Sequence, residues 1–432
     1  MAEGTGDDTR IPDDVAKAAV LPESYGDERN ITYPAFAWLR KNMPVGRAHV
    51  EGYDPVWLIT KYDDIMSVER EPKLFNSSSG NMLLQTHAED EFVRSANNGS
   101  TRVLDSLPFM DPPEHTQMKG LTSNWFTPKN VRRFSEQIRE IAAEDVEKLM
   151  SFDGEFDWVQ DFALHYPLRV IMGIFGVPLD DQPKMLELTQ QFFGANDPDE
   201  QREDVEATEG QAARQFQAAR DDFFDYFHQF TVDRRENPRD DLMSVIANAK
   251  IDGEFIPESF VNGSYIQVAT AGHDTTSSSV SGAALAMSYD LGQLAKVRED
   301  NSLIAGLVEE SVRWTSPVKH FMRTVSEDTS LRGVSMREGD RVMLNYPSAN
   351  RDEDYFDNAD DFDVTRSPNK HLGFGFGPHT CLGQHVAKLE MTILWEELIP
   401  KVKKIELAGE PQPLKANFVA GFKALPVKIT KA

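Results

Sequence analysis

The chain has 432 residues, enough for two or three domains by size alone, yet no linker-like stretch divides it. Its formal net charge of -26 argues against a surface built to bind nucleic acid or anionic lipid. The single cysteine excludes an internal disulfide and fits a reducing compartment. No apolar segment typical of a signal peptide or membrane anchor precedes the first predicted helix, so we expect a cytoplasmic protein.

The N-terminal quarter of the sequence predicts an arm, a helix, a strand pair and a loop. Residues 1–32 are expected to be an acidic, extended and partly mobile arm, and residues 33–432 to form one domain. A short helix is expected over 34–42, and two strands should follow around the turn Gly52-Tyr53-Asp54-Pro55. Residues 76–106 are rich in Ser, Asn and Gly and predict a long loop, which in a compact domain is usually disordered or functional.

The next motif, DPPEHTQMK over residues 111–119, predicts the start of a helix at Pro112 and Pro113. His115 and Lys119 are four residues apart and would share one face of that helix, where they could clamp a carboxylate. The alternative, which spacing alone favours, is a solvated pair of surface side chains.

Helical periodicity of apolar residues continues through the middle of the chain. It predicts buried helices over 131–150 and 170–175. Two further helices are expected over 185–193 and 211–235, joined by the acidic stretch 197–209. Their many phenylalanines are core residues by default.

A long helix is expected from Pro257 to Asp290, through the run IQVATAGHDTTSSSV. Gly272 and the hydroxyl residues after Asp274 are poor helix formers, because glycine is permissive and short hydroxyl side chains compete for backbone hydrogen bonds. We therefore expect a local distortion that frees a carbonyl and leaves room for water. Taken alone, the same run is also consistent with an ordinary polar helix face.

Later segments predict one more helix, a strand and a hairpin. Glu310 and Arg313 lie on adjacent turns of the helix, where such ion pairs are common and usually superficial. A strand is expected over 341–344 and a hairpin over 417–429.

The run HLGFGFGPHTCLG, residues 371–383, contains the only cysteine. Its glycines and Pro378 predict a bent ribbon, poor in side chains, that a flat ligand can approach closely. A helix is predicted directly after Cys381, so the sulfur lies at a helix N-terminus, where free amides and the macrodipole favour a thiolate. A low-pKa thiolate is a metal ligand, whereas a lone buried cysteine is more often an inert core residue.

The cysteine run resembles the haem-binding loop of the cytochrome P450 monooxygenases, on the residues Phe374, Gly375, Gly377, His379, Cys381 and Gly383. The resemblance implies that Cys381 is the axial ligand of haem b, iron protoporphyrin IX. It also implies that Phe374 packs beside the sulfur and that His379 bonds a haem propionate. Histidine rather than arginine at position 379 resembles the soluble bacterial branch of the family. The chain as a whole looks closest to the bacterial enzymes that hydroxylate terpineol and cymene.

Further motifs extend the resemblance over nearly the whole chain. The segment AGHDTT, residues 271–276, is similar to the family's oxygen-activating segment, with Asp274 and Thr275 as the acid and alcohol of a proton relay. By the same resemblance His115, Lys119 and Arg323 are propionate ligands, although lysine lacks the planar fork of the arginine common in the family.

A fourth motif is the family's Glu-x-x-Arg element, which matches Glu310 and Arg313. The resemblance implies that a later arginine joins this pair in a buried structural lock, and Arg366 is the candidate.

The resemblance implies a mainly α fold with a small β region, in which haem is buried between the long central helix and the helix after the cysteine. The loop over 76–106 should cover the substrate pocket, and the helices over 185–193 and 211–235 should form a mobile lid that opens at their acidic connection. The expected pocket is mostly apolar and draws on Leu83, Leu104, Phe193, Val268, Ala271, Val318, Phe321 and Phe418.

The activity implied is insertion of one oxygen atom from O2 into a C–H bond of a small hydrophobic substrate, such as a monoterpene or an alkyl aromatic. One cysteine cannot ligate an iron-sulfur cluster, so NAD(P)H electrons should arrive through a separate ferredoxin and its reductase. The expected monomer would receive this partner on a basic face made of Lys119, Lys129, Arg132, Arg133 and Lys388. The alternatives are a peroxide-driven peroxygenase and a haem-thiolate sensor without turnover.

Overall fold

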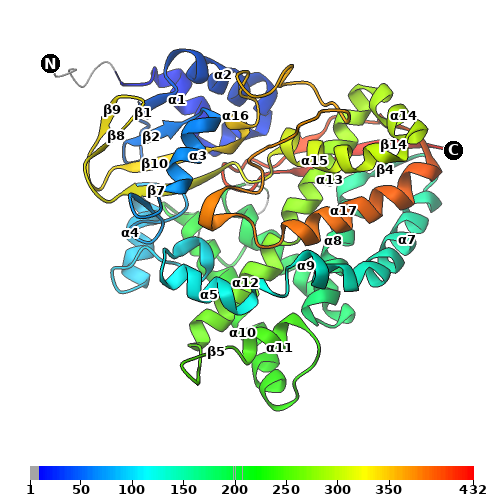
Figure 1. The fold of residues 1–432 in the computed structure, drawn as a ribbon, viewed down its shortest axis with the longest axis horizontal. Helices are drawn as coiled ribbons and strands as arrows, with labels where there is room; N and C mark the ends of the chain where they lie inside the picture. The colour runs from blue at the N-terminus through cyan, green and yellow to red at the C-terminus, as the bar shows by residue number, and fades with distance from the viewer. Residues whose placement is uncertain (1–8, 198, 200, 207) are drawn as a thin grey trace.

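The computed structural model describes residues 9–432 except 198, 200 and 207, and it is mainly helical with small sheets, as expected (Figure 1). The five-stranded sheet lies at one end of the molecule together with the first helices of the chain, and most of the other helices fill the other end and the lower part of the view. Residues 1–8 of the expected arm and three positions of the expected acidic connection lie outside the described residues.

The expectation of an extended arm is wrong for residues 9–32. They form helix α1 (Asp13–Val20) and the turns Pro22–Asp27 and Glu28–Thr32, which lead into α2 (Tyr33–Asn42). Ala16, Ala19 and Val20 recur at helical spacing and are buried against the apolar face of α2 and the neighbouring sheet. Averaged over the whole segment, the acidic composition concealed this short apolar stripe.

Five strands form the main sheet in the order β1-β2-β10-β7-β3. The expected strand pair is present, because β1 runs antiparallel to β2 with Val45 opposite Ile59. Strand β10 pairs with β2 in parallel and with β7 in antiparallel fashion, so Arg341 lies between Val56 and Thr324. The bounds are β1 Val45–Ala48, β2 Val56–Ile59, β3 Phe75–Asn76, β7 His320–Val325 and β10 Arg341–Asn345.

The expected loop over 76–106 contains a helix, α4 (His87–Ala96), which starts at a capping box. Thr86 Oγ1 accepts from the amide of Glu89 at 3.3 Å, and the Glu89 carboxylate accepts from the amide of Thr86 at 2.7 Å. The Thr-x-x-Glu spacing was therefore a usable helix signal. The other helices before the central one are α3 Tyr62–Arg70, α5 Glu114–Ser123, α6 Pro128–Val131, α7 Ser135–Ser151, α8 His165–Phe175, α9 Gln182–Phe193, α10 Gln211–Glu236 and α11 Leu242–Ala247.

The expected long helix is divided in two, α12 (Glu258–Ala271) and α13 (Asp274–Tyr289). Almost every side chain of α13 is buried, so this helix runs through the main core. The remaining helices are α14 Leu291–Glu299, α15 Ile304–Thr315, α16 Tyr346–Ala349 and α17 Gln384–Leu398, the last of which follows the cysteine loop.

The hairpin expected over 417–429 is wrong in its pairing. Strand β13 (Phe422–Ala424) pairs with β12 (Gln412–Pro413), and the loop between them carries Phe418. Strand β14 (Pro426–Lys431) instead joins β11 (Val402–Leu407) and β4 (Glu155–Asp157) in a second sheet. Two small hairpins complete the fold, β5 Lys250–Ile251 with β6 Glu254–Phe255 and β8 Thr329–Leu331 with β9 Val334–Met336.

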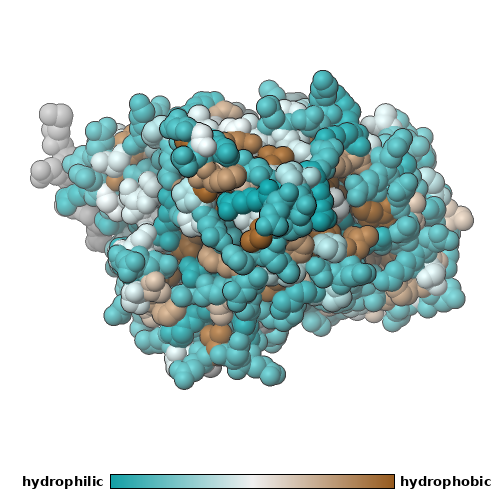
Figure 2. All heavy atoms as spheres, turned by 90° about the horizontal axis from the view of Figure 1, so that it is seen from below, coloured by the Kyte–Doolittle hydropathy of each residue, from teal (hydrophilic) through white to brown (hydrophobic). Residues whose placement is uncertain are grey.

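Most of the face seen in Figure 2 is hydrophilic, and hydrophobic residues show there only as small separate patches. Within the part of the chain that the structure describes, no helix has the length and apolar character needed to cross a bilayer.

Candidate active site

The cysteine loop lies against α3 and is shaped by glycines. Gly375 and Gly377 have φ values of 65° and 66°, which favour glycine. A Cβ atom at Gly377 would also lie only 2.5 Å from the main-chain oxygen of Glu69. The amide of Cys381 donates to the carbonyl of Phe374 at 2.8 Å and so closes the loop. Substituting Gly377 would therefore force the loop away from α3.

The Cys381 side chain is exposed at the end of this loop, just before α17. Desolvation by the protein around the loop raises the pKa of the thiol, and the amides of Gly383 and Gln384 and the charge of Lys119 act in the opposite direction. The low-pKa thiolate stays a prediction, because this shift is that of a thiol with no metal ion beside it. A coordinated metal ion deprotonates a ligating thiol outright.

A cluster of nitrogen-bearing side chains lies beside the loop. The rings of His115 and His379 are 4.4 Å apart. Lys119 Nζ donates to the carbonyls of Pro378 at 2.6 Å and Thr380 at 3.1 Å, and thus tethers α5 to the loop.

Burial and mutual repulsion within this cluster disfavour additional positive charge. Burial lowers the pKa of His115 to about 4, and the charge of Lys119 adds to the effect. Burial likewise lowers the pKa of His379 to about 2, with Arg323 as the next cause.

Arg323 is buried, and its Nη2 lies 3.9 Å from Oε1 of Glu69. Burial raises the pKa of that carboxyl group to about 7, so it offers only part of a negative charge near neutrality. The four nitrogen groups are thus arranged to receive negative charge from outside the chain. An iron porphyrin with two propionates fits them and the sulfur of Cys381.

The interruption of the central helix is centred on Gly272 and His273. The amide of Gly272 donates to the carbonyl of Val268 at 3.3 Å, and regular helix resumes when the amide of Ser277 donates to the carbonyl of His273 at 3.0 Å. Thr275 Oγ1 donates to the carbonyl of Ala271 at 2.8 Å. The distortion is present as expected, and the Thr275 hydroxyl takes up the carbonyl of Ala271.

Two side chains of α9 hold the residues of this break, and sequence reasoning missed both. Gln190 Nε2 donates to Oδ1 of the buried Asp274 at 2.9 Å. Thr189 Oγ1 lies 3.1 Å from Nδ1 of His273, whose Nε2 is 2.7 Å from the carbonyl of Leu164. No local pattern could reveal a pairing between residues this far apart in sequence.

A buried carboxyl group on α17 also contacts the break and was missed. Thr276 Oγ1 donates to Oε1 of Glu390 at 2.9 Å. Burial raises the pKa of Glu390 well above its ordinary value. The contact ties the central helix to the helix that follows Cys381.

Comparison with known proteins decides the family. The family model "Cytochrome P450" matches residues 56–415. The chain belongs to the cytochrome P450 family. It is accordingly a haem-iron monooxygenase that uses O2, an organic substrate and an electron-transfer partner.

Relatives of this P450 match it along most of its length. Cytochrome P450-terp of Pseudomonas sp is 51% identical and covers 98% of this chain and 99% of its own. Linalool 8-monooxygenase of Pseudomonas putida is 30% identical over 94% of this chain and 97% of its own. The crystal structure of CYP108D1 from Novosphingobium aromaticivorans superposes with a TM-score of 0.89 at 39% identity, covering 98% of this P450 and 100% of that chain.

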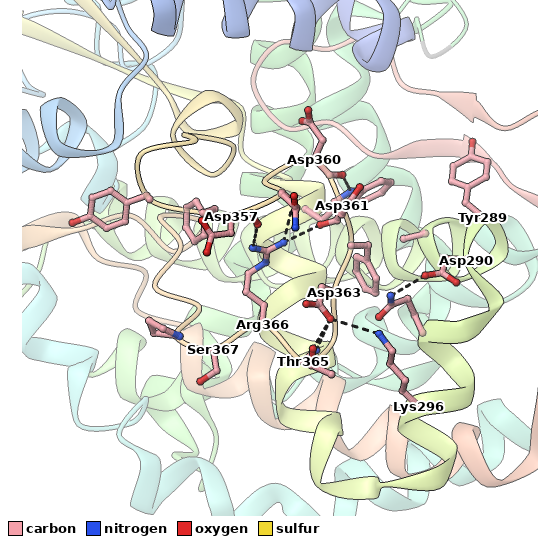
Figure 3. A pocket seen from close by; sticks show the side chains of 18 of the residues that line it. Tyr289, Asp290, Lys296, Asp357, Asp360, Asp361, Asp363, Thr365, Arg366 and Ser367 are labelled. Atoms are coloured by element: carbon pink, nitrogen blue, oxygen red, sulfur yellow. Dashed lines mark hydrogen bonds and ion pairs between the residues drawn. The ribbon is translucent and has the colours of Figure 1, made fainter.

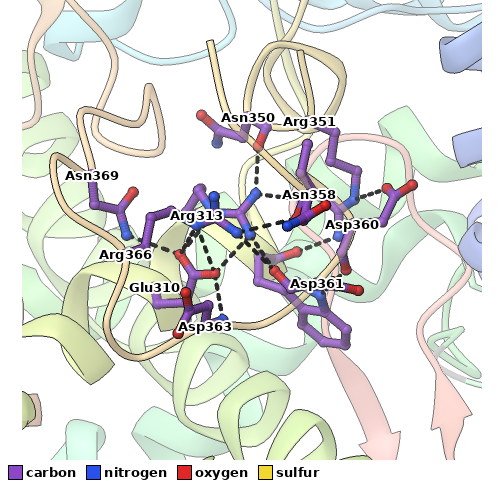
Figure 4. A network of polar contacts seen from close by, with 12 residues as sticks. Glu310, Arg313, Asn350, Arg351, Asn358, Asp360, Asp361, Asp363, Arg366 and Asn369 are labelled. Carbon is purple, nitrogen blue, oxygen red and sulfur yellow. Dashed lines mark hydrogen bonds and ion pairs between the residues drawn. The ribbon is translucent and has the colours of Figure 1, made fainter. Parts of the chain in front are cut away.

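The Glu-x-x-Arg element of this P450 is the centre of a polar network in which Glu310 and Arg313 are fully buried (Figure 4). Arg313 donates through Nε and Nη2 to the two carboxylate oxygens of Glu310, each at 2.7 Å. Arg366 Nε lies 3.2 Å from the same oxygens. The terminal guanidinium nitrogen atoms of Arg313 and Arg366 also donate to main-chain carbonyls of residues 350–361. The three side chains are thus joined, and they hold the loop that precedes the cysteine run.

Some of the expected pocket residues come together and others do not. The ring of Phe418 lies 6.3 Å from that of Phe193 and 5.5 Å from that of Phe321, and all three side chains are half-buried. Val318 and Val268 are also half-buried, and Ala271 is exposed at the end of α12. Leu104 is buried in the core, and Leu83 lines a different cavity, described below.

A cleft of about 710 Å³ lies between the end of α13, α14 and the loop over 355–368 (Figure 3). Of the residues singled out in the sequence, only Arg366 lines it. Two carboxylates of the cleft have partners within the fold: Asp290 caps α14, and Asp363 accepts from the amide and hydroxyl of Thr365. This cleft is separate from the cysteine site.

The five cations of the expected docking face differ in how free they are. Lys119 is turned onto the cysteine loop, Lys388 pairs with Glu309 at 2.7 Å, and Arg133 pairs with Asp240 at 3.2 Å. Lys129 and Arg132 are exposed, and among the described residues neither has a carboxylate partner. They lie on and just after α6, which packs against α17.

Proposed function

We propose that this P450 hydroxylates a small hydrophobic molecule of the monoterpene or alkyl-aromatic class. The proposal rests on the full-length similarity to cytochrome P450-terp, and similarity to linalool 8-monooxygenase agrees with it. The half-buried cluster of Phe193, Phe321 and Phe418 offers the apolar surface that such a substrate needs.

A binding screen tests the substrate class directly. Terpineol, cymene and linalool should each be titrated into the haem-loaded protein while the spin state is followed in the haem spectrum. A saturable shift, followed by NADH-dependent formation of a hydroxylated product with a surrogate ferredoxin, is expected for at least one of them. Strong shifts with long-chain fatty acids alone would contradict the proposal.

Cys381 would hold the iron of haem b, with Phe374 and Gly383 beside the sulfur. A Cβ atom at Gly383 would lie 4.0 Å from the Cys381 sulfur, an ordinary contact, so the distance alone does not demand glycine there. His115, Lys119, Arg323 and His379 would bind the propionates. When bound, thiolate-ligated haem supplies the activation of O2.

The chain's own contribution to the reaction is proton delivery and exclusion of water. Thr275 and Asp274 would carry protons to the O2 site, with Gln190 fixing the orientation of the Asp274 carboxylate. Gln190 is a positioning residue in this scheme, because it acts through Asp274.

Thr275→Ala should uncouple the reaction. NADH consumption should continue while hydrogen peroxide replaces most of the hydroxylated product, a loss in coupling of roughly 10- to 100-fold if the alcohol is needed for proton transfer. Product and peroxide per NADH are the measurement. Ser281→Ala is the control, because Ser281 is on the same helix and its buried hydroxyl has no partner among the described residues. Unchanged coupling in Thr275→Ala would contradict the assigned role.

We also propose that electrons come from a ferredoxin that docks over α6. Reversing Lys129 and Arg132 together to glutamate should slow electron transfer from an acidic ferredoxin by about 10-fold or more at low salt, and by less at high salt. The double reversal of the exposed Lys403 and Lys404 on β11 changes the net charge equally and should have little effect. Equal slowing in both variants would show that only overall charge matters.

A further inference from the structure

A second cavity, of about 300 Å³, lies between the main sheet, the segment 81–86 and α4. In Figure 1 α4 lies beside the lower end of this sheet. The apolar side chains that line this cavity are Val56, Leu83, Leu84 and Met322. Its polar walls include Asn81, Gln85 and Arg341, and none of the haem-binding or relay residues proposed above lines it.

Arg341 has an incomplete set of partners. One terminal nitrogen donates to the carbonyl of Asn81, but its buried Nε has no partner among the described residues. No described carboxylate forms an ion pair with it, and Asp90 and Asp54 act on it only through longer-range attraction. Burial lowers its pKa to about 10. A half-buried guanidinium without a counter-charge is costly, and a ligand anion would remove that cost.

Asn81 supplies a second unused donor on the same wall. Its side chain is only 2% exposed, its Oδ1 accepts from the amide of Leu83 at 2.9 Å, and its Nδ2 has no partner among the described residues. Because Oδ1 is already held by the backbone, the amide cannot simply turn over to avoid the deficit.

The charged groups at the rim, in contrast, are satisfied by one another. Arg94 Nε is 2.6 Å from Asp90, and His87 Nε2 is 3.1 Å from Asp54. They leave Arg341 as the unpaired cation of the cavity.

We propose that this cavity binds the carboxylate of a small apolar acid, with Arg341 and Asn81 as its donors. A carboxylate offers acceptors to both nitrogens at once, and the aliphatic walls fit a compact hydrocarbon body. The volume suits a molecule of the size of a monoterpene acid. The site is independent of the haem reaction.

The walls of the cavity connect to strand β7. The amide of Met322 donates to the carbonyl of Met82 at 2.9 Å, and the amide of Leu84 donates to His320 Nε2 at 3.1 Å. A bound acid therefore stabilises the segment 81–86 against the strand that also carries Phe321.

Calorimetric titration of the haem-loaded protein with cyclohexanecarboxylate and with neutral cyclohexylmethanol tests the proposal. The acid should bind and the alcohol should bind at least about 10-fold more weakly. Arg341→Gln should weaken the acid by about 10- to 100-fold, the usual range for a lost charged hydrogen bond, and leave the alcohol unchanged. Asn81→Asp should also weaken the acid, because it places a negative charge in the site.

The control is Arg94→Gln, which removes a cation of the same cavity that is already paired; acid affinity should stay within about twofold. The acid should still bind when a terpene saturates the haem site. Displacement by the terpene, equal binding of acid and alcohol, or full affinity in both Arg341→Gln and Asn81→Asp would overturn the proposal. If Arg341→Gln does not fold, Asn81→Asp decides.

Discussion

A Cys381→His variant should lose hydroxylation down to the background rate, even if it binds haem. Thiolate donates electron density that favours cleavage of the O–O bond, and a neutral imidazole does not. The carbon monoxide adduct of the reduced protein should correspondingly absorb like that of a histidine-ligated pigment. Product formation and this spectrum, measured on the same preparation, check the prediction.

Thr380→Ser is the matched control for that change. Thr380 precedes the cysteine, and its hydroxyl donates to the carbonyl of Gly377 at 2.8 Å, a contact that serine can keep. This variant should retain a thiolate-type spectrum and most of its activity. A histidine-type spectrum in the unsubstituted protein, or undiminished hydroxylation by Cys381→His, would show that Cys381 is not the ligand, and with it the whole site would be wrong.

Glu310→Leu should destabilise the protein by about 3–5 kcal/mol, the cost of leaving a buried partner charge without compensation. Glu310 accepts from Arg313, Arg366, Asn369 and the amide of Asp363, so its removal strips several donors together. Because the free energy of unfolding of a domain is only about 5–15 kcal/mol, poor recovery of haem-loaded protein is expected. The measurement is the urea midpoint followed by circular dichroism and by haem absorption.

Glu396→Leu provides the comparison. Glu396 pairs with Arg139 at 2.5 Å on a half-exposed surface, where an ion pair contributes about 0–1 kcal/mol. Similar losses in the two variants would mean that burial of the Glu310 network is not what stabilises the loop.

Features that depend on local backbone chemistry could be predicted from the sequence. The glycine-rich run around Cys381 needs positive φ and close approach to α3, and glycine is the residue that meets both demands. Gly272 likewise predicted the break between α12 and α13, although the hydroxyl residues after Asp274, which were also expected to be distorted, lie in regular helix. Such constraints act within a few residues and leave a readable pattern.

Features that depend on distant partners could not be predicted. Gln190 meets Asp274, and Glu390 meets Thr276, only after the chain has folded, and nothing next to either residue marks it. The pairing of β13 with β12 rather than with β14 could not be predicted either, because β14 pairs instead with β11, a strand that the local sequence around residues 417–429 does not contain.

Because α9 bonds both residues of the break in the central helix, movement of α9 would open the lid and change the proton relay at the same time. Thr189 and Gln190 are neighbours on α9, so a rigid departure of that helix would release His273 and Asp274 in the same instant. When α9 is displaced outward, the Asp274 carboxylate would lose its hydrogen bond to Gln190. A substrate that draws α9 inward would restore this bond and the orientation of the carboxylate. Substitutions on α9 that do not contact the substrate would then still change the amount of hydroxylated product formed per NADH consumed.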